Sequence, residues 1–160
     1  MPRLPINFDN TVMYQFVCKD LNITERYVGH TTEFKNRKNC HKSNCNNQKQ
    51  KAYNFKVYQF IRANGGWDNW DMIMIEAYPC ANKLEAAKRE RFNKELLNAN
   101  LNSTVPSRTK KEYYADNSDK YNAISIAYYA ANKEKQKAYH KAYVAANKEK
   151  QKAYSVAYYK

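Results

Sequence analysis

Residues 11–18 (TVMYQFVC) and the later run at residues 25–28 (ERYV) form the stretch that decides the fold. The first run is rich in β-branched and aromatic residues, a composition typical of a β-strand. Asp20 and Asn22 lie between the two runs, and both residue types favour turns because their side chains hydrogen-bond to the nearby backbone. The stretch therefore predicts a β-hairpin.

The expected register of this hairpin places two tyrosines opposite each other. If the turn is centred between Asp20 and Leu21, Tyr14 pairs directly with Tyr27, with Cβ atoms about 4.5–5.5 Å apart. Gly29 ends the second strand. A glycine at this point predicts either a close backbone approach that a side chain would obstruct or a positive φ angle.

A helix is predicted directly after the hairpin. Thr31 or Thr32 can act as its N-cap, because a hydroxyl oxygen accepts hydrogen bonds from the first backbone N–H groups of a helix. Arg37 and His41 are four residues apart and therefore share one face of this helix.

Two more helices and a third strand follow in the sequence. Apolar residues at helical spacing predict a helix over residues 52–64, which ends at two glycines. Residues 71–78 predict a strand, and strong helix formers predict a third helix from about residue 82 to residue 98. We expect a first domain over residues 1–107 and a tail over residues 108–160.

The tail repeats itself with a period of 15 residues, since residues 127–141 are nearly copied by residues 142–156. Ala, Lys, Glu and Gln dominate, which predicts a long, exposed, basic helix. Several tyrosines fall on one slowly drifting face of this helix: Tyr128, Tyr139, Tyr143, Tyr154 and Tyr158.

The chain is strongly basic, with 28 Lys and Arg residues against 15 Asp and Glu and a net charge of +13. Such an excess favours a polyanionic partner, nucleic acid before membrane. The excess is densest in the tail, where residues 108–160 contain 12 basic and 5 acidic side chains. The tail therefore adds to any affinity for nucleic acid.

The same composition predicts a soluble intracellular protein. No apolar run approaches the roughly 20 residues of a membrane span, and the N-terminus lacks the apolar core of a signal peptide. Four cysteines without regular spacing fit a reducing compartment and free thiols. The spacing of Cys40, His41 and Cys45 does not match a zinc finger or ribbon.

Several residues could together hydrolyse a phosphodiester, although each has an ordinary structural reading. Glu90 could bind Mg²⁺, which often takes only one or two protein carboxylates, or it could pair with a neighbouring Lys or Arg. Arg37 could hold a phosphate oxygen or simply be solvated. Tyr14 and Tyr27 could act on water or fill the core of the sheet, and His41 could accept a proton or be structural.

In combination these residues resemble the GIY-YIG endonuclease superfamily. Met13-Tyr14 stands for the first motif and Tyr27-Val28-Gly29 for the second. Arg37, ten residues after Tyr27, matches the catalytic arginine of the family, and Glu90 matches its metal-binding glutamate. Asn102 matches the asparagine that closes the active site.

Other positions refine the resemblance. His41 stands at a position that is often histidine, and His30 stands where many members have lysine. Val12 replaces the first glycine of the name motif, and Asn93 stands where an apolar residue is usual. The segments that flank the core look like stand-alone members found in giant DNA viruses.

The resemblance implies an α+β fold with a small three-stranded antiparallel sheet flanked by helices, here followed by the long basic helix. It also implies phosphodiester cleavage that depends on Mg²⁺ or Mn²⁺. The implied roles are activation of water by Tyr14, assistance by His41 or His30, phosphate binding by Arg37, metal binding by Glu90 and orientation of water or phosphate by Tyr27.

The favoured function is a metal-dependent DNA endonuclease that contacts DNA mainly through phosphates. The alternatives are a catalytically inactive DNA-binding module and an RNA-cleaving nuclease. For the tail, three interpretations stay open: stacking of its tyrosines on unpaired bases, self-association with another chain, and a solvated charged helix without a partner. If the protein is viral, its place is the cytoplasm or nucleus of the host cell.

Overall fold

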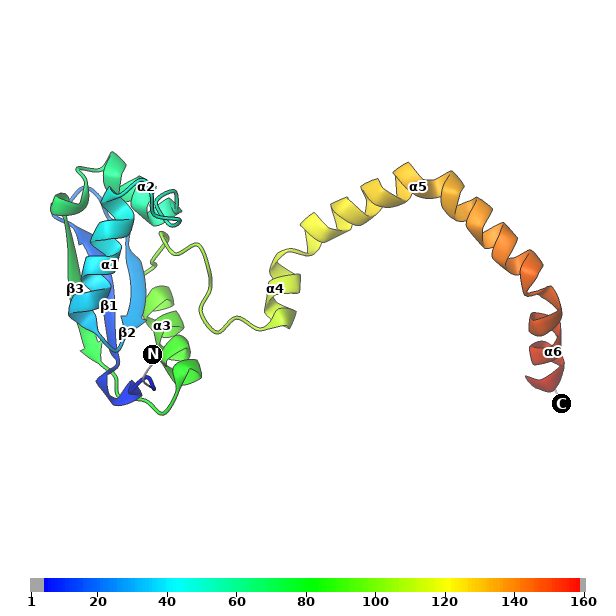
Figure 1. Cartoon of the computed structure of the whole chain (residues 1–160), viewed down its shortest axis with the longest axis horizontal. Helices are drawn as coiled ribbons and strands as arrows, with labels where there is room; N and C mark the ends of the chain where they lie inside the picture. The colour runs from blue at the N-terminus through cyan, green and yellow to red at the C-terminus, as the bar shows by residue number, and fades with distance from the viewer. Residues whose placement is uncertain (1–4, 159–160) are drawn as a thin grey trace. The chain divides into compact units, whose positions relative to one another are not determined.

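In the computed structural model, which describes residues 5–158, three strands form one antiparallel sheet (Figure 1). They are β1 (Val12–Cys18), β2 (Tyr27–Thr31) and β3 (Trp70–Ala77), in the order β2-β1-β3. The expected α+β fold with a three-stranded antiparallel sheet is therefore confirmed. Because β2 is an edge strand, one of its sides is open to residues from elsewhere in the chain.

Three helices flank this sheet, preceded or joined by short 3₁₀ turns. The helices are α1 (Phe34–Asn46), α2 (Lys56–Ala63) and α3 (Lys83–Leu96), and the 3₁₀ turns are η1 (Phe8–Asn10) and η2 (Trp67–Asn69). Neither Thr31 nor Thr32 caps α1, so that prediction was wrong. The N-cap is Glu33, and the Thr31 hydroxyl instead accepts a hydrogen bond from the Glu33 N–H.

The predicted hairpin exists, but its register differs from the expected one by two residues. Tyr14 pairs with Gly29, and Tyr27 pairs with Phe16. The turn is centred later because the Ile23 N–H donates to the Asp20 carbonyl, and the Asp20 carboxylate also accepts the Asn22 N–H. The chain then runs outside the sheet until β2 begins. The two tyrosines still share one face of the sheet, with ring centroids 6.3 Å apart.

Consecutive residues of β1 face opposite layers. The side chains of Tyr14, Phe16 and Cys18 pack in a large cluster under α1 and α2, whereas Met13 packs against Ala86 of α3. Both Met13 and Tyr14 are fully buried, and a bulge in the pairing of β1 with β3 lies between them. Strand β1 is therefore covered by helices on both faces.

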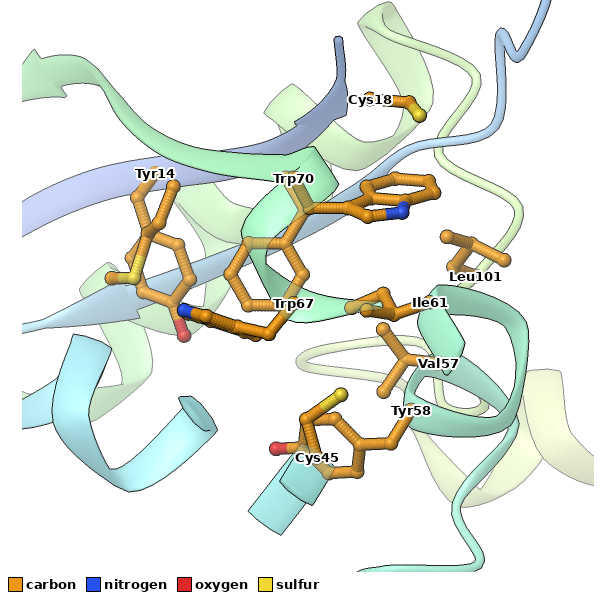
Figure 2. Close-up of a cluster of buried hydrophobic side chains, with 11 residues drawn as sticks. Tyr14, Cys18, Cys45, Val57, Tyr58, Ile61, Trp67, Trp70 and Leu101 are labelled. Carbon is orange, nitrogen blue, oxygen red and sulfur yellow. The ribbon is translucent and has the colours of Figure 1, made fainter. Parts of the chain in front are cut away.

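The large cluster contains most of the buried apolar side chains of the domain (Figure 2). It joins the sheet, including Trp70 at the start of β3, with the C-terminal half of α1, helix α2 and Trp67 of η2. Its buried members are Tyr14, Phe16, Cys18, Cys45, Val57, Tyr58, Ile61, Trp67, Trp70, Met72 and Leu101. Burial of this much aromatic surface supplies the main driving force for folding.

The chain divides into two units between Arg108 and Thr109. The second unit contains three helices, α4 (Lys110–Asp116), α5 (Ser118–Ala146) and α6 (Lys148–Tyr158). The long helix expected in the tail corresponds to α5, and the helical path is interrupted at Asn117 and Asn147. Both asparagines have φ near −110° and ψ near 10°, outside the usual helical values. Within residues 5–158, no helix combines the length and the apolarity that a bilayer crossing requires.

Candidate active site

A cleft of about 440 Å³ opens where β2, α1 and α3 meet. Strand β2 contributes Tyr27, Gly29 and His30, α1 contributes Arg37, and α3 contributes Glu90. These residues are far apart in sequence and come together because α3 packs against β2. The cleft therefore collects four of the seven site residues that the sequence predicts.

Glu90 is bonded to a histidine and not to the basic residues beside it. Its Oε2 is paired with Nδ1 of His30, and both side chains are mostly buried. Arg89 pairs with Glu76, and Arg91 pairs with Glu95. Among the described residues no other hydrogen bond to the Glu90 carboxylate is found, so one of its oxygens remains for a ligand in the cleft.

Tyr14 lies beneath the cleft and does not line it. Its side chain has no solvent exposure, and its hydroxyl lies 2.7 Å from Nε2 of His41. Nε of Arg37 donates a second hydrogen bond to the same oxygen at 3.0 Å. Burial raises the pKa of Tyr14 far above its ordinary value, and the nearby Tyr27 adds to the rise, whereas Arg37 opposes it.

Gly29 is required because the Tyr14 ring packs against its backbone. A Cβ at this position would lie 2.5 Å from the Tyr14 hydroxyl oxygen and 2.6 Å from the ring carbon that carries it. Both distances are shorter than real Cβ contacts, and the ring is fixed by its two hydrogen bonds. The predicted close approach is thus present, and Gly29 does not have a positive φ.

His41 is the buried centre of a hydrogen-bond network. It is 2% exposed, and its two ring nitrogens lie 2.7 Å from the Tyr14 hydroxyl and 2.8 Å from the Tyr58 hydroxyl. Burial, reinforced by the charge of Arg37, lowers the pKa of His41 to about 3. His41 is therefore neutral near pH 7.

Two proton arrangements satisfy both ring nitrogens of His41, and they differ in which tyrosine hydroxyl, Tyr14 or Tyr58, keeps its proton unused. Arg37 and the amide nitrogen of Asn44 can only donate, to Tyr14 and Tyr58 respectively. The arrangement in which Tyr14 donates to Nε2 of His41 and the N–H at Nδ1 donates to Tyr58 is favoured, because it gives the proton of the fully buried Tyr14 an acceptor. The Tyr58 hydroxyl then keeps its own proton for another acceptor.

Tyr58 and Asn44 are functional-site neighbours that the sequence reasoning missed. Tyr58 lies between Val57 and Ile61 on the buried face of α2, where it reads as an ordinary core residue. The residue type itself was a clue in the sequence, because the hydroxyl of a buried tyrosine usually has a hydrogen-bond partner. Nothing local in the sequence identifies that partner as His41.

A second cavity of about 270 Å³ lies on the other side of the network. Its walls include His41, Asn44 and Tyr58, and it shares Tyr27 and Arg37 with the cleft. Tyr27 is thus the one of the two motif tyrosines that reaches open space. Burial raises the pKa of Tyr27, the charge of Glu90 raises it further, and Arg37 opposes the rise.

Asn102 binds the open edge of β2. Its Oδ1 accepts the Val28 N–H at 2.9 Å, and its Nδ2 donates to the Val28 carbonyl at 2.7 Å. The Leu101 N–H also donates to the Arg26 carbonyl. Residues 101 and 102 therefore cover the outer edge of β2, and Asn102 does not line the cleft.

Asn93 is satisfied although it stands where an apolar residue is usual in the family that the sequence resembles. Its side chain is buried and donates to Oε1 of Glu76 at 2.6 Å. Arg89 donates two hydrogen bonds to the two oxygens of the same carboxylate. These bonds hold the pKa of Glu76 below its ordinary value. The polar side chain of Asn93 is thus accommodated in the buried face of α3.

The geometry sorts the seven predicted site residues into three groups. Four line the cleft, two form the buried layer beneath it, and one binds the outer edge of β2. In that order they are Tyr27, His30, Arg37 and Glu90, then Tyr14 and His41, then Asn102. Within the described part of the chain, no group of three or more His, Cys, Asp or Glu side chains is arranged to hold a metal.

Comparison with known proteins identifies the domain that carries this site. The family model described as the GIY-YIG catalytic domain matches residues 10–103, which is more than half of the 160 residues of the chain. No curated protein and no solved structure matches the chain.

Proposed function

Because the chain belongs to the GIY-YIG nuclease family, we propose that it is an endonuclease that hydrolyses phosphodiester bonds in DNA with one divalent metal ion. The observation that supports this most is the cleft in which Arg37, Tyr27 and Glu90 share one open space. A cation, a hydroxyl and a carboxylate are there within reach of one phosphate group. The net charge of +13 suits a polyanionic substrate.

Glu90 is suited to hold the metal. Its carboxylate is mostly buried in the wall of the cleft, and the one hydrogen bond it makes to a described residue, His30, uses a single oxygen. Mg²⁺ keeps most of its waters and needs few protein carboxylates. When bound, Mg²⁺ or Mn²⁺ neutralises phosphate charge and acidifies water.

Arg37 binds the phosphate in this proposal. Its Nε is used by Tyr14, which fixes the plane of the guanidinium group and leaves the terminal nitrogens as the donors for a phosphate oxygen. Arg37 lines the cleft at the same time. Tyr14, His41 and Tyr58 therefore act as positioning residues beneath it.

The role first expected for Tyr14 passes to groups that reach the cleft. Tyr14 is fully buried and its hydroxyl already has two partners, so it does not contact water in this conformation. Tyr27 lines the cleft and orients the attacking water. His30 takes its proton at Nε2, because Nδ1 is bonded to Glu90. His41 is not available for this step, since both of its nitrogens are used.

Cleavage of supercoiled plasmid with Mg²⁺ tests this function. The Glu90→Gln variant should lose at least about 100-fold in rate, because electrostatic stabilisation of a reacting group contributes about 10²–10³-fold. Glu95→Gln is the matched control, since Glu95 lies on the same helix but is exposed and pairs with Arg91. Addition of EDTA should stop the wild-type protein.

Three outcomes would contradict the proposal. Equal nicking by wild type and Glu90→Gln would remove Glu90 from the reaction. Tight binding of DNA without nicking would favour the inactive DNA-binding module, and cleavage of RNA alone would favour the RNA-cleaving alternative.

The resemblance to members of giant DNA viruses and the intracellular location remain predictions from the sequence.

A further inference from the structure

The tail carries two shallow hollows, 15 residues apart on the exposed surface of α5 and α6, which share four equivalent lining residues; the first is also lined by Gln136 and His140 and the second by Ser155. Each is lined by two tyrosines, an asparagine and a lysine, and their volumes are about 410 and 500 Å³. The first contains Tyr128, Asn132, Lys135 and Tyr139, and the second contains Tyr143, Asn147, Lys150 and Tyr154. We call these eight residues the tyrosine stripe.

The asparagine of each hollow is fixed in the same way. The side-chain amide of Asn132 donates to the Tyr128 carbonyl, and that of Asn147 donates to the Tyr143 carbonyl, both at 2.8 Å. The repeat is therefore present in three-dimensional contacts and not only in the letters of the sequence. The second tyrosine of each hollow is largely solvent-exposed, at 72% for Tyr139 and 74% for Tyr154.

The position of the lysines argues against pairing of two tails through this stripe. Lys135 follows Tyr128 by seven residues and precedes Tyr139 by four, so it lies between the two rings on the same helix face. Packing one stripe on another would bring these lysines together and bury them, which is costly without an anionic partner. An anionic polymer would satisfy the same charges.

We propose that the tyrosine stripe binds single-stranded DNA, with the rings stacked on unpaired bases and Lys135 and Lys150 on phosphates. The choice of DNA rests on the proposed function. Exposed aromatic rings interleaved with cations are the chemistry that binds single strands, because every base has a face on which a ring can stack. The bases of a duplex are already stacked on each other, so the rings gain nothing from it. The enzyme thereby prefers DNA that contains an unpaired segment.

Binding of the full chain to a fluorescent oligothymidylate and to a duplex of equal length tests this proposal. EDTA in the buffer prevents cleavage, so binding is measured apart from nuclease activity. The variant with Tyr128, Tyr139, Tyr143 and Tyr154 changed to Leu keeps apolar side chains of high helix propensity but removes the stacking rings. It should bind the single strand at least about tenfold more weakly and bind the duplex within about twofold of wild type. The matched control is Tyr129→Leu, an exposed tyrosine on a different side of the same helix, which should bind like wild type.

A pair of lysine variants provides a second test that does not depend on the tyrosines. Lys135→Gln with Lys150→Gln removes two charges from the stripe, whereas Lys133→Gln with Lys148→Gln removes two charges from outside it. Both variants have the same net charge, so a difference in their single-strand binding arises from where the charges were removed. The stripe pair should weaken single-strand binding more and reduce its salt dependence more.

Several results would overturn the proposal. These are unchanged single-strand binding by the leucine variant, equal effects of the two lysine pairs, and binding of an RNA oligomer in preference to oligothymidylate. Sedimentation that shows wild-type dimers retained by the leucine variant would make a second copy of the chain the partner. Normal single-strand binding in a protein that never cleaves DNA would contradict the proposed nuclease function and leave this proposal standing. Circular dichroism checks that the leucine variant keeps its helices, and if it does not, the lysine pairs carry the test.

Discussion

At the scale of single residues, the Tyr14 hydroxyl connects the cleft to the interior of the domain. It accepts from Arg37 on the cleft side and meets His41 on the interior side, while Gly29 leaves it the necessary space. Each group in this chain of contacts has few alternative partners, because most of them are buried. A substitution at one end of this network should therefore alter the position of the groups at the other end.

The far end of the network offers the first test of this connection. In Tyr58→Phe the ring remains but the acceptor for His41 and Asn44 is lost, which should cost about 1–3 kcal/mol of unfolding free energy. The cleavage rate should fall by about tenfold as Arg37 loses its fixed position, with DNA affinity in EDTA nearly unchanged. Tyr53→Phe is the control, since its hydroxyl has no hydrogen bond to the described residues. Equal rates for the two variants would separate Tyr58 from the active site.

The depressed pKa of His41 predicts a pH dependence of stability. The folded protein binds a proton at His41 only near pH 3, whereas the unfolded chain binds it near pH 6.5. The stabilisation is therefore complete above pH 6.5 and is lost as the pH falls, by up to about 1.4 kcal/mol per pH unit. Urea unfolding between pH 7 and pH 5 measures the slope, which should be smaller in His41→Gln. Identical slopes would show that His41 titrates normally. Glu76, with its lowered pKa, contributes only near and below its ordinary value, outside this range.

At the scale of elements, β2 is the part of the fold on which the site depends. It carries Tyr27, Gly29 and His30, and it is held by β1 on one side and by Asn102 on the other. Short edge strands are otherwise prone to fray or to pair with other chains. The asparagine that follows α3 thus keeps three site residues in place without entering the cleft.

Removal of the Asn102 side chain tests this view. Asn102→Ala deletes both hydrogen bonds to Val28 and should destabilise the protein by about 1–3 kcal/mol. The amide hydrogen of Val28 should exchange with solvent faster than in wild type. Asn100→Ala changes an exposed asparagine of the same segment, and it should leave the exchange rate unaltered. Unchanged exchange in Asn102→Ala would mean that β1 alone holds the strand.

Local patterns predicted the elements well because each depends on nearby residues. Arg37 and His41 lie on one helix face as expected. Helix α2 ends at Ala63, just before the predicted glycines, but it begins at Lys56 and not at residue 52, because residues 51–55 form turns and a bend. The predicted hairpin register was wrong because the turn spans residues 20–23, closed by a hydrogen bond from the Ile23 N–H to the Asp20 carbonyl, and is centred one residue later than expected. Tyr58 and the edge-binding role of Asn102 depend on contacts between distant segments, which no local pattern contains.

At the scale of the whole molecule, charge governs the expected encounter with DNA. Both units contribute to the net charge of +13, and residues 108–160 carry 12 of the 28 basic side chains. Lysines on an exposed helix contact phosphates without reading sequence. Binding should therefore be strong at low salt and largely independent of sequence.

Measurement of duplex binding in EDTA at several salt concentrations tests this expectation. If about six phosphates are contacted, affinity should fall by about 10³-fold between 50 and 200 mM salt. Duplexes of unrelated sequence should give the same curve. A weak salt dependence, or a sharp preference for one site of eight or more base pairs, would contradict a mainly electrostatic encounter.

The 15-residue period has a consequence for how the length of this protein can change. Fifteen residues advance an α-helix by about 22 Å and leave it rotated by about 60° after four full turns. Each copy brings its own asparagine-to-carbonyl hydrogen bond, so gain or loss of a whole copy leaves no broken contact. Recombination between the near-identical copies can therefore lengthen or shorten the tail by one whole copy at a time. Loss of a single residue instead turns everything that follows by about 100° and destroys the alignment.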